Sequence, residues 1–383
     1  MEKSLNNSEK SLQTDNILSL AEGLREKSLY QQSLKLFKQA LKRLREAKDP
    51  EGIYHCMLAS GDLYRMTGDF GLAARSYTDA VKVAPQLKSP VKVADAKVGL
   101  GLSLRAQGKW REAIKLIGES KKIYEKKNDA HGIAFTLWAG AGALRIKGDI
   151  TGAIKAFKES HKIFKSMKDS QGIGYCLCGI GGASRMAGRF RESLKYYTAA
   201  NRLFSSERDR FGKAYSYCGI GNAYRMLGEY KNAFAYFTKA TGLYKKMGDR
   251  VSYAYTLWGL GTAYKMTGVH DKARDYFMEA MRLFKKTKDP RGIIYCELGF
   301  GELSLLKGRK AAASNFFAAA LKGTTEHMFA LEKCHVETLI SFINETSSSG
   351  NRGTKKSSGK IKHTCYDRLN LKLGFEALPL NIP

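Results

Sequence analysis

Seven positions, spaced forty residues apart, carry a cation. They are Arg25, Arg65, Arg105, Arg145, Arg185, Arg225 and Lys265, which we call the cation column. A planar guanidinium donates forked, charge-assisted hydrogen bonds to carboxylates and phosphates, whereas lysine makes a point contact. Six arginines in succession are more than a general basic bias produces. The column therefore predicts a surface that binds an anionic partner.

Two cysteines and two histidines near the C-terminus have the side chains that bind zinc. Cys334 and His335 are adjacent, and His363 is followed closely by Cys365. Both gaps are shorter than the usual spacing of zinc ligands. Cys334 and His335 also fall on one predicted helix, where neighbouring residues point to different faces. We therefore predict no metal site and no cofactor.

Catalytic motifs are missing from the sequence. A Gly-x-Gly pattern recurs, as at Gly219 and Gly221, but it lies inside a predicted helix with no strand before it. A phosphate-binding loop needs that strand. The sequence contains neither the Gly-x-Ser-x-Gly nor the His-Glu-x-x-His motif. We predict that the protein is not an enzyme.

The column is positioned by eight copies of a forty-residue unit, between about residues 21 and 320. In one copy, Tyr217, Ile220, Gly221 and Tyr224 fall on one face of a helix. Gly228 then suits a helix end, because glycine accepts the left-handed conformation found there. A column of aspartates is placed to cap the next helix. It contains Asp49, Asp129, Asp169, Asp209, Asp249 and Asp289. Each copy thus predicts a helix, a tight turn, a second helix and a short loop.

This pattern resembles the tetratricopeptide repeat. The residues that carry the resemblance in two copies are Tyr217, Ile220, Gly221, Tyr224, Ala233, Phe237 and Ala240, then Leu257, Leu260, Gly261, Tyr264, Ala273, Phe277 and Ala280. The resemblance covers about residues 15–322 and implies an all-α, right-handed superhelical solenoid that binds peptides or proteins. The period is 40 residues rather than the usual 34, as in spindle-orientation adaptors, kinesin light chains and some bacterial response regulators.

The resemblance also implies where a partner would bind. In tetratricopeptide-repeat proteins, the stripe of the first helix that holds the cation column lines a concave groove. Flanking contact residues would be Tyr175, Tyr215, Tyr255, Tyr295, Trp138, Trp258, Met186 and Met226. The expected partner is a protein or peptide with an extended acidic segment and interspersed apolar or aromatic residues. Many family members hold the ligand backbone with an asparagine, but this chain has alanine or glycine there, as at Ala139 and Gly219, so ligand geometry is not carried over.

Two other interpretations stay open. The arginines could be structural, because Glu22 and Asp62 lie three residues before Arg25 and Arg65. The same place in the next copies holds Leu102, Gly142, Gly182, Asn222 and Thr262, which cannot neutralise a cation. Alternatively, arginines interleaved with aromatic residues, and a pI near 9.7, are typical of proteins that bind RNA or single-stranded nucleic acid. No recognised nucleic-acid motif accompanies them.

Composition favours a helical repeat protein in a reducing compartment. The 383 residues carry a net charge of +29, which attracts polyanions without specifying which. No run of apolar residues is long enough to span a membrane. Five of the seven cysteines lie inside the repeats, which favours a cytoplasmic location. The oligomeric state and the identity of the partner are not predicted.

We divide the chain into four regions. Residues 1–14 are expected to be disordered, 15–322 to form the solenoid and 323–346 to form a capping helix. Residues 347–383 form a basic tail, expected to be disordered. Its apolar end could bind a partner, fold back into the groove or stay free. Folding back is disfavoured by the like charges of tail and groove.

Overall fold

The protein is an all-α solenoid. The computed structural model describes residues 2–348, 364–369, 371 and 381–382, and within this part of the chain it contains helices and no strands. The predicted all-α class is therefore confirmed. None of the described helices is long and apolar enough to cross a membrane.

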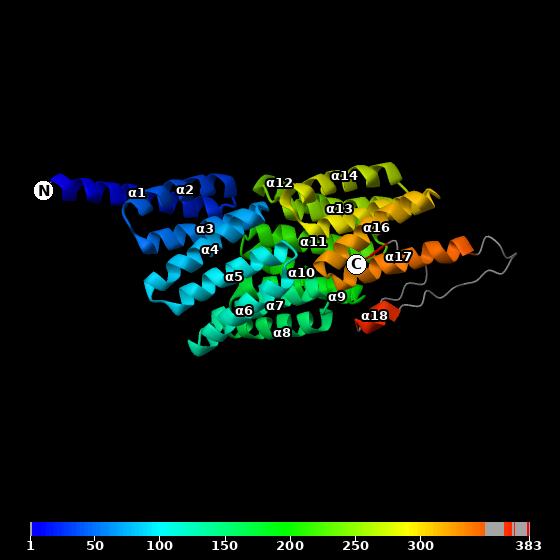
Figure 1. Cartoon of the computed structure of the whole chain (residues 1–383), viewed down its shortest axis with the longest axis horizontal. Helices are drawn as coiled ribbons and strands as arrows, with labels where there is room; N and C mark the ends of the chain where they lie inside the picture. Colours follow the sequence, from blue (N-terminus) through cyan, green and yellow to red (C-terminus); the bar gives the residue numbers. More distant parts are fainter. Residues whose placement is uncertain (1, 349–363, 370, 372–380, 383) are drawn as a thin grey trace.

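Eight helical hairpins follow one another with the predicted period (Figure 1). They are α1 (Glu2–Glu26) with α2 (Tyr30–Glu46), α3 (Pro50–Thr67) with α4 (Phe70–Val83), α5 (Pro90–Ala106) with α6 (Trp110–Lys126), α7 (Ala130–Lys147) with α8 (Ile150–Ser166), α9 (Ser170–Met186) with α10 (Phe190–Ser206), α11 (Arg210–Met226) with α12 (Tyr230–Met247), α13 (Arg250–Met266) with α14 (His270–Thr287), and α15 (Pro290–Leu306) with α16 (Lys310–His327). A short 3-10 helix, η1 (Ala84–Leu87), follows α4, and α17 (Ala330–Ser348) and α18 (Thr364–Arg368) follow the last hairpin.

The helix ends are made by the residues that the sequence indicated. All six aspartates of the predicted column accept a hydrogen bond from a backbone N–H in the first turn of the next helix. Ser89 does the same for α5. Gly148 ends α7 at φ 96°, a left-handed conformation that only glycine adopts without strain. The capping prediction is confirmed.

Small residues let the two helices of a hairpin approach closely. A Cβ atom added to Gly261 would lie 2.7 Å from the ring of Phe277, and one added to Gly61 would lie 2.8 Å from the ring of Tyr77. Both rings are buried. The glycine of the first helix and the aromatic residue of the second are therefore packed as a pair, repeat after repeat.

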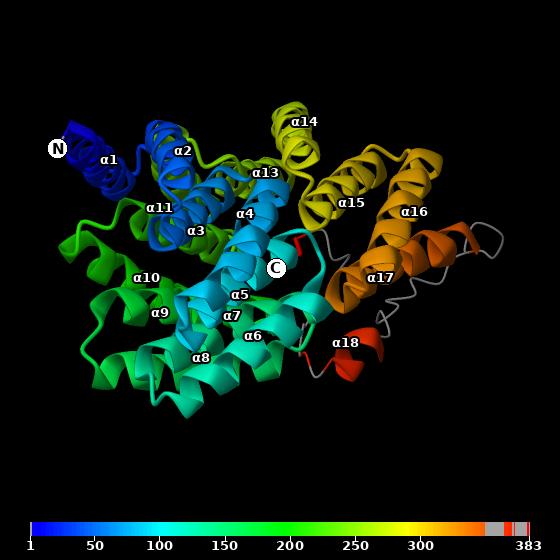
Figure 2. The ribbon, with the colours of Figure 1, turned by 60° about the vertical axis from the view of Figure 1, so that its left-hand side comes forward.

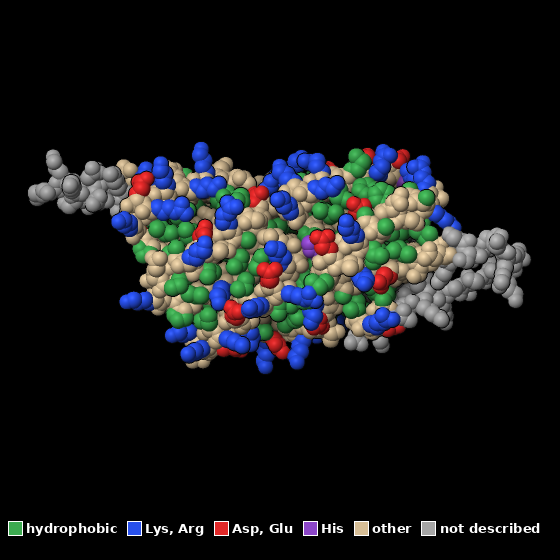
Figure 3. Space-filling view, viewed as in Figure 1, with side chains coloured by type: hydrophobic (Ala, Val, Ile, Leu, Met, Phe, Trp, Pro, Cys, Tyr) green, Lys and Arg blue, Asp and Glu red, His purple; other side chains and the backbone are tan. Residues whose placement is uncertain are grey.

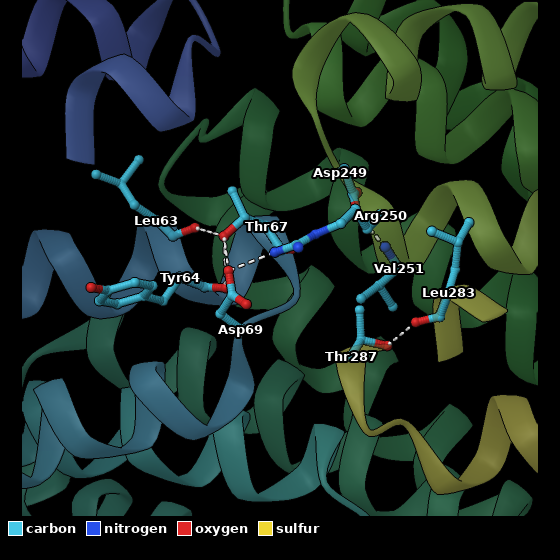
Figure 4. A network of polar contacts seen from close by, with 9 residues as sticks. All are labelled: Leu63, Tyr64, Thr67, Asp69, Asp249, Arg250, Val251, Leu283 and Thr287. Carbon is cyan, nitrogen blue, oxygen red and sulfur yellow. Dashed lines mark hydrogen bonds and ion pairs between the residues drawn. The ribbon is translucent and has the colours of Figure 1, made fainter. Parts of the chain in front are cut away.

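The superhelix is wound so tightly that successive turns touch. Arg250 at the start of α13 donates from Nε to the carbonyl oxygen of Thr67, at 2.8 Å, and from Nη2 to Asp69 Oδ2, at 2.6 Å (Figure 4). Gly68, in the same turn, has Val251 and Thr287 against its Cα. These contacts join segments that are more than 180 residues apart.

Other hairpins repeat this contact in register. Trp110 Nε1 donates to the carbonyl oxygen of His327, at 3.1 Å, and Arg210 Nη1 to that of Lys27, at 3.3 Å. Gly148 packs against Ala330 at the start of α17. The turn of each of the first four hairpins thus meets the start of the unit five places later, and α3–α7 lie beside α13–α17 (Figures 1 and 2). The interior of the superhelix is therefore bounded by two successive turns.

The termini differ from the expected division of the chain. Helix α1 begins at Glu2, although residues 1–14 were expected to be disordered. The capping helix α17 begins at Ala330, because α16 continues to His327. The predicted disorder of 349–363 lies outside the described residues.

The described part of the tail is packed onto the solenoid. Cys334 of α17 and Cys365 of α18 form a disulfide. Tyr366 and Leu371 are buried in one apolar cluster with residues of α8, α9 and α17. His335 Nδ1 and the hydroxyl of Tyr366 are hydrogen-bonded at 2.6 Å. These residues belong to the tail that was expected to be disordered, but here they are ordered against the solenoid.

Candidate functional site

The first helices of the hairpins surround a central cavity of about 310 Å³. This volume lies at the lower end of the ~300–1,000 Å³ range that is usual for ligand sites. Nine of the predicted contact residues line it, and these are Arg65, Arg105, Arg145, Arg185, Met186, Tyr215, Tyr255, Trp258 and Tyr295. The other five, Arg225, Lys265, Tyr175, Trp138 and Met226, do not line it.

The middle of the cation column, namely Arg105, Arg145 and Arg185, has no carboxylate partner among the described residues. Arg105 Nη1 donates to the carbonyl oxygen of Ala139, at 3.3 Å. Arg145 and Arg185 make no hydrogen bond or ion pair with the described part of the chain, and the Nε atoms of both are buried. We call these three residues the middle arginines.

Glycines on the next helix make room for two of these guanidinium groups. A Cβ atom on Gly142 would lie 2.1 Å from Nη1 of Arg105, and one on Gly182 would lie 2.7 Å from Nη1 of Arg145. The sequence indicated that these positions could not neutralise a cation. The structure adds that they hold the space which the preceding arginine occupies.

Several cations lie close to one another on the wall of the cavity. Burial, followed by the neighbouring charges of Arg145 and Arg65, lowers the pKa of Arg105 to about 10. Removing a cation from water without pairing it is unfavourable, so an anion in the cavity would be stabilised by these groups. Asp249 and Asp289 also line the cavity, but they cap α13 and α15 with their Oδ1 atoms.

Towards both ends of the column, the cations form ion pairs with the chain's own carboxylates, as Arg25 does with Glu22. Arg65 forms an ion pair with Asp62, whose Oδ1 also accepts from the hydroxyl of Tyr77, at 2.6 Å. Lys265 forms an ion pair with Glu302, and the two side chains are 0% and 2% exposed. Lys265, predicted as a contact residue, is therefore held in a buried pair that no partner reaches in this structure.

Surface charge is spread more evenly. Lysine and arginine side chains are scattered over the whole visible face and do not gather into one patch (Figure 3). Much of the net charge of +29 thus lies outside the cavity. The middle arginines differ from these residues because they line the cavity and are half-buried.

Comparison with known proteins supports the repeat assignment. Residues 175–246 match the family model of the tetratricopeptide repeat. The chain therefore contains tetratricopeptide repeats in this segment. No curated protein matches it in sequence.

Three solved structures share the fold of this chain. A Rap protein complexed with Competence and Sporulation Factor has a TM-score of 0.57 and 14% identity, over 88% of this chain and 99% of that chain. The Rap conjugation gene regulator of the plasmid pLS20, in complex with the Phr* peptide, has a TM-score of 0.64 and 12% identity, over 82% and 96%. NprR in complex with its cognate peptide NprX has a TM-score of 0.59 and 16% identity, over 93% and 99%.

The aromatic residues of the tetratricopeptide repeats mainly join one hairpin to the next. Trp138 Nε1 donates to the carbonyl oxygen of Tyr175, at 3.3 Å, and Trp258 Nε1 to that of Tyr295, at 3.0 Å. The Tyr175 hydroxyl donates to Asp209, at 2.9 Å. Each indole thus bonds to a carbonyl oxygen 37 residues later, in the next hairpin. These rings therefore stabilise the packing of one hairpin on the next.

The exposure of the predicted apolar contacts differs. Met186, Tyr295 and Trp258 are 2%, 5% and 6% exposed, whereas Tyr215 and Met226 are half-buried. Tyr215 stacks on Phe211, with the ring centroids 6.0 Å apart.

Sequence reasoning missed Arg291. Its Nε donates to Glu332 Oε1, at 2.5 Å, and Nη2 donates to the hydroxyl of Tyr295, at 2.8 Å. It lines the cavity from α15 but stands outside the cation column. Its sequence position, in the first turn of the helix that Asp289 caps, predicts no binding role.

The two cysteines that were considered as zinc ligands form a disulfide. Cys334 and Cys365 are bonded to each other, so they offer no thiolate to a metal. His335 faces Tyr366, and His363 lies outside the described residues. The residues that the structure describes contain no cluster of three or more potential metal ligands.

Proposed function

We propose that this protein is a non-catalytic scaffold or adaptor that binds an extended acidic peptide or protein segment inside its superhelix. The observation that carries the proposal is the set of middle arginines, which line the cavity without a carboxylate among the described residues. A carboxylate placed between Arg145 and Arg185 would make charge-assisted hydrogen bonds, which are about twice as strong as neutral ones. The relatives of similar fold were solved with peptides or a factor bound, which supports a peptide as the ligand.

The contacts between successive turns limit the access of a segment to the cavity. The contacts between turns include polar ones, such as those of Arg250 with Thr67 and Asp69, and apolar ones, such as the shared cluster of Trp110 and Phe329. A solenoid whose repeats contact mainly their neighbours can change its pitch by small rotations at each interface. We infer that the turns separate to admit the segment and close around it.

Nucleic acid is the weaker candidate. A single strand binds such proteins by stacking its bases on exposed aromatic faces. Trp258 and Tyr295 are buried and hydrogen-bonded, so they present no such face. We prefer the peptide for this reason.

We propose a cytoplasmic location on the basis of the cysteines. Five of them are free, and four of these five are buried, as expected in a reducing compartment. The Cys334–Cys365 disulfide argues against a reducing compartment.

The test is a binding measurement with a defined probe. A fluorescein-labelled peptide of alternating glutamate and leucine is titrated with wild type and with the Arg105→Gln, Arg145→Gln, Arg185→Gln variant. The loss of charge-assisted contacts predicts affinity lower by about tenfold or more. Single-stranded RNA is titrated in parallel.

A matched control removes the same number of charges from the outer surface. Lys155, Lys158 and Lys162 are exposed on α8, and their change to glutamine is expected to leave the affinity within about twofold. Equal losses in the two variants would reduce the effect to net charge and overturn the proposal. Tighter binding of RNA than of the acidic peptide would favour the alternative.

A further inference from the structure

Arg225 is the member of the cation column that has a remote peptide segment bound to it. Its Nη2 donates to the carbonyl oxygen of Ile382, at 3.1 Å, and its Nη1 donates to Oδ1 of Asn381. The Nε and Nη2 atoms also donate to Asn222 Oδ1, at 3.3 and 3.2 Å. All of these acceptors are neutral. Arg225 is fully buried, so its guanidinium is satisfied by a carboxamide and a backbone carbonyl from the C-terminal part of the chain.

The Asn381 side chain contacts Arg225 in two directions. Its Oδ1 accepts from the guanidinium, and its Nδ2 donates to the backbone oxygen of Arg225, at 3.2 Å. That oxygen belongs to the last turn of α11 and also accepts from the N–H of Gly228, at 3.2 Å. A carboxamide offers an acceptor and a donor on two separate atoms, as this geometry requires, whereas a carboxylate offers acceptors alone. The contact therefore selects asparagine or glutamine.

The next residue is selected by burial. Ile382 is 1% exposed and belongs to the apolar cluster that contains Trp258, Leu260 and Leu298. Trp258 also lies under Arg225, with Cζ 5.3 Å from the ring centroid. An aliphatic side chain at this position removes apolar surface from water on both partners.

We propose that Arg225, with Asn222 and Trp258, forms a peptide-binding subsite for an asparagine followed by an aliphatic residue, and that the chain's own Asn381–Ile382 is the resident ligand. The carbonyl contact of Nη2 is made with the backbone, as expected for an extended peptide. An incoming segment of the same chemistry must displace the resident one.

The subsite adjoins the middle arginines. Asn222 and Trp258 line the same cavity as Arg185. Burial, followed by the charge of Arg185, lowers the pKa of Arg225 to about 9. A bound segment that places its carboxamide on Arg225 would therefore have its acidic residues near Arg185. This extension rests on the proposed function, whereas the subsite itself rests on the contacts of Asn381 and Ile382.

The resident ligand competes as a tethered one. Nine residues lie between Asn381 and Leu371, which is buried beside the Cys334–Cys365 disulfide. A short tether of this kind gives an effective concentration in the millimolar range. A free peptide of the same sequence must exceed it to occupy the site in wild type.

The experiment uses the full chain with Asn381→Ala and Ile382→Ala. The probe is a fluorescein-labelled peptide of residues 372–383, KLGFEALPLNIP. The variant is expected to bind this probe at least about tenfold more tightly than wild type, because the tether no longer competes. Equal affinity of the two proteins would overturn the proposal. Adding Arg225→Met to the variant is expected to abolish the gain, and a gain that persists would also overturn it.

A second arm tests the selection without altering the protein's fold. A probe with leucine in place of asparagine keeps the size of the side chain but removes both polar contacts. Its affinity for the variant is expected to fall by about tenfold, and unchanged affinity would contradict the carboxamide subsite. If the double variant does not fold, Asn381→Leu alone serves as the unblocked protein, since Ile382 is kept.

The outcome is separable from that of the proposed function. The alternating glutamate–leucine peptide is titrated with the same proteins. Failure of this acidic probe, together with tight binding of the tail probe to the variant, would reject the acidic partner and keep the subsite. Binding of the acidic probe that depends on the middle arginines, without any gain for the tail probe, would reject the subsite and keep the proposed function.

Discussion

The middle and the ends of the cation column come from the same position of the same repeat, yet their charges are treated differently. At the ends, Arg65 faces Asp62 and Lys265 faces Glu302. In the middle, Arg145 and Arg185 have no charged partner in the described part of the chain. Periodic sequence therefore gives a periodic backbone, while the function of each side chain depends on what its neighbours supply.

The difference can be traced to the position three residues before the cation, which pairs within its own repeat at Asp62 and with the cation of the preceding repeat at Glu302. Asp62 in the second repeat neutralises Arg65, and Asn222 accepts from Arg225. Gly142 and Gly182 supply no polar group and leave space instead. A repeat protein can thus switch a cation between a structural and a binding role by a single change on the same helix face. Four predictions examine this comparison.

The largest effect is expected at the buried ion pair of the column's end. Changing Lys265 to Met leaves the carboxylate of Glu302 buried and unpaired, which predicts a loss of about 3–5 kcal/mol in the free energy of unfolding. Arg145→Gln removes a cation with no described partner and is expected to cost less than about 1 kcal/mol. Urea unfolding followed by circular dichroism measures both.

A compensating change is the control for this prediction. Lys265→Met with Glu302→Leu removes both charges and is expected to recover most of the stability, because an apolar pair of similar size replaces the ion pair. If Lys265→Met proved no more destabilising than Arg145→Gln, the contrast between end and middle would have no energetic basis.

Asp249 is a buried charge on the cavity wall that can be titrated. Burial raises its pKa to about 6, against an ordinary value of 3.8. The Asp249 carboxylate therefore binds a proton more tightly in the folded protein than in the unfolded chain. For this reason the free energy of unfolding falls as pH rises from about 4 to about 6. The expected loss is about 3 kcal/mol over this window.

Substitution by asparagine isolates the effect of Asp249. Asparagine caps a helix as well as aspartate does, so Asp249→Asn is expected to flatten the pH dependence between 4 and 6. Asp129 caps α7 from a more exposed position, and Asp129→Asn serves as the control. An unchanged slope in Asp249→Asn would assign the pH dependence to other groups.

The fold was predictable because its determinants are local. Spacing within one copy predicted the two helices, and the capping role of residues such as Asp209 followed from their position before a helix. Each repeat packs mainly on its neighbours, so these rules act independently in every copy. The all-α solenoid and its helix caps were therefore accessible to sequence reasoning alone.

The closed interior and the docked tail were not predictable, because they depend on distant pairs. Nothing in the repeat pattern relates Arg250 to Asp69, which are 181 residues apart. The like charges of tail and groove argued against folding back, but Asn381 and Ile382 bind Arg225 through neutral groups. Net charge was the wrong quantity for a contact made by a carboxamide and a carbonyl.

The contact between turns keeps the middle arginines enclosed, and its removal is expected to have a smaller effect than the preceding changes. Arg250→Gln loses the ion pair with Asp69 and the hydrogen bond to Thr67, which are partly exposed. We expect a loss of about 1–2 kcal/mol and a larger radius of gyration in small-angle X-ray scattering. Arg274→Gln, which loses an exposed pair with Asp275 on α14, is expected to change neither quantity measurably. Identical scattering from all three proteins would show that this contact does not hold the turns together.

The smallest change tests the middle of the column without altering any charge. Gly142→Ala places a methyl group where Nη1 of Arg105 lies, so the guanidinium must move, at little cost to the fold because its side chain is flexible. We expect weaker binding of the acidic probe, by up to about tenfold, since charge-assisted contacts depend on position. Gly118→Ala on the exposed face of α6 meets nothing and is expected to stabilise the helix by about 0.5–1 kcal/mol without changing affinity. Unchanged affinity in Gly142→Ala would mean that Arg105 does not contact the peptide, which would leave Arg145 and Arg185 as the binding pair.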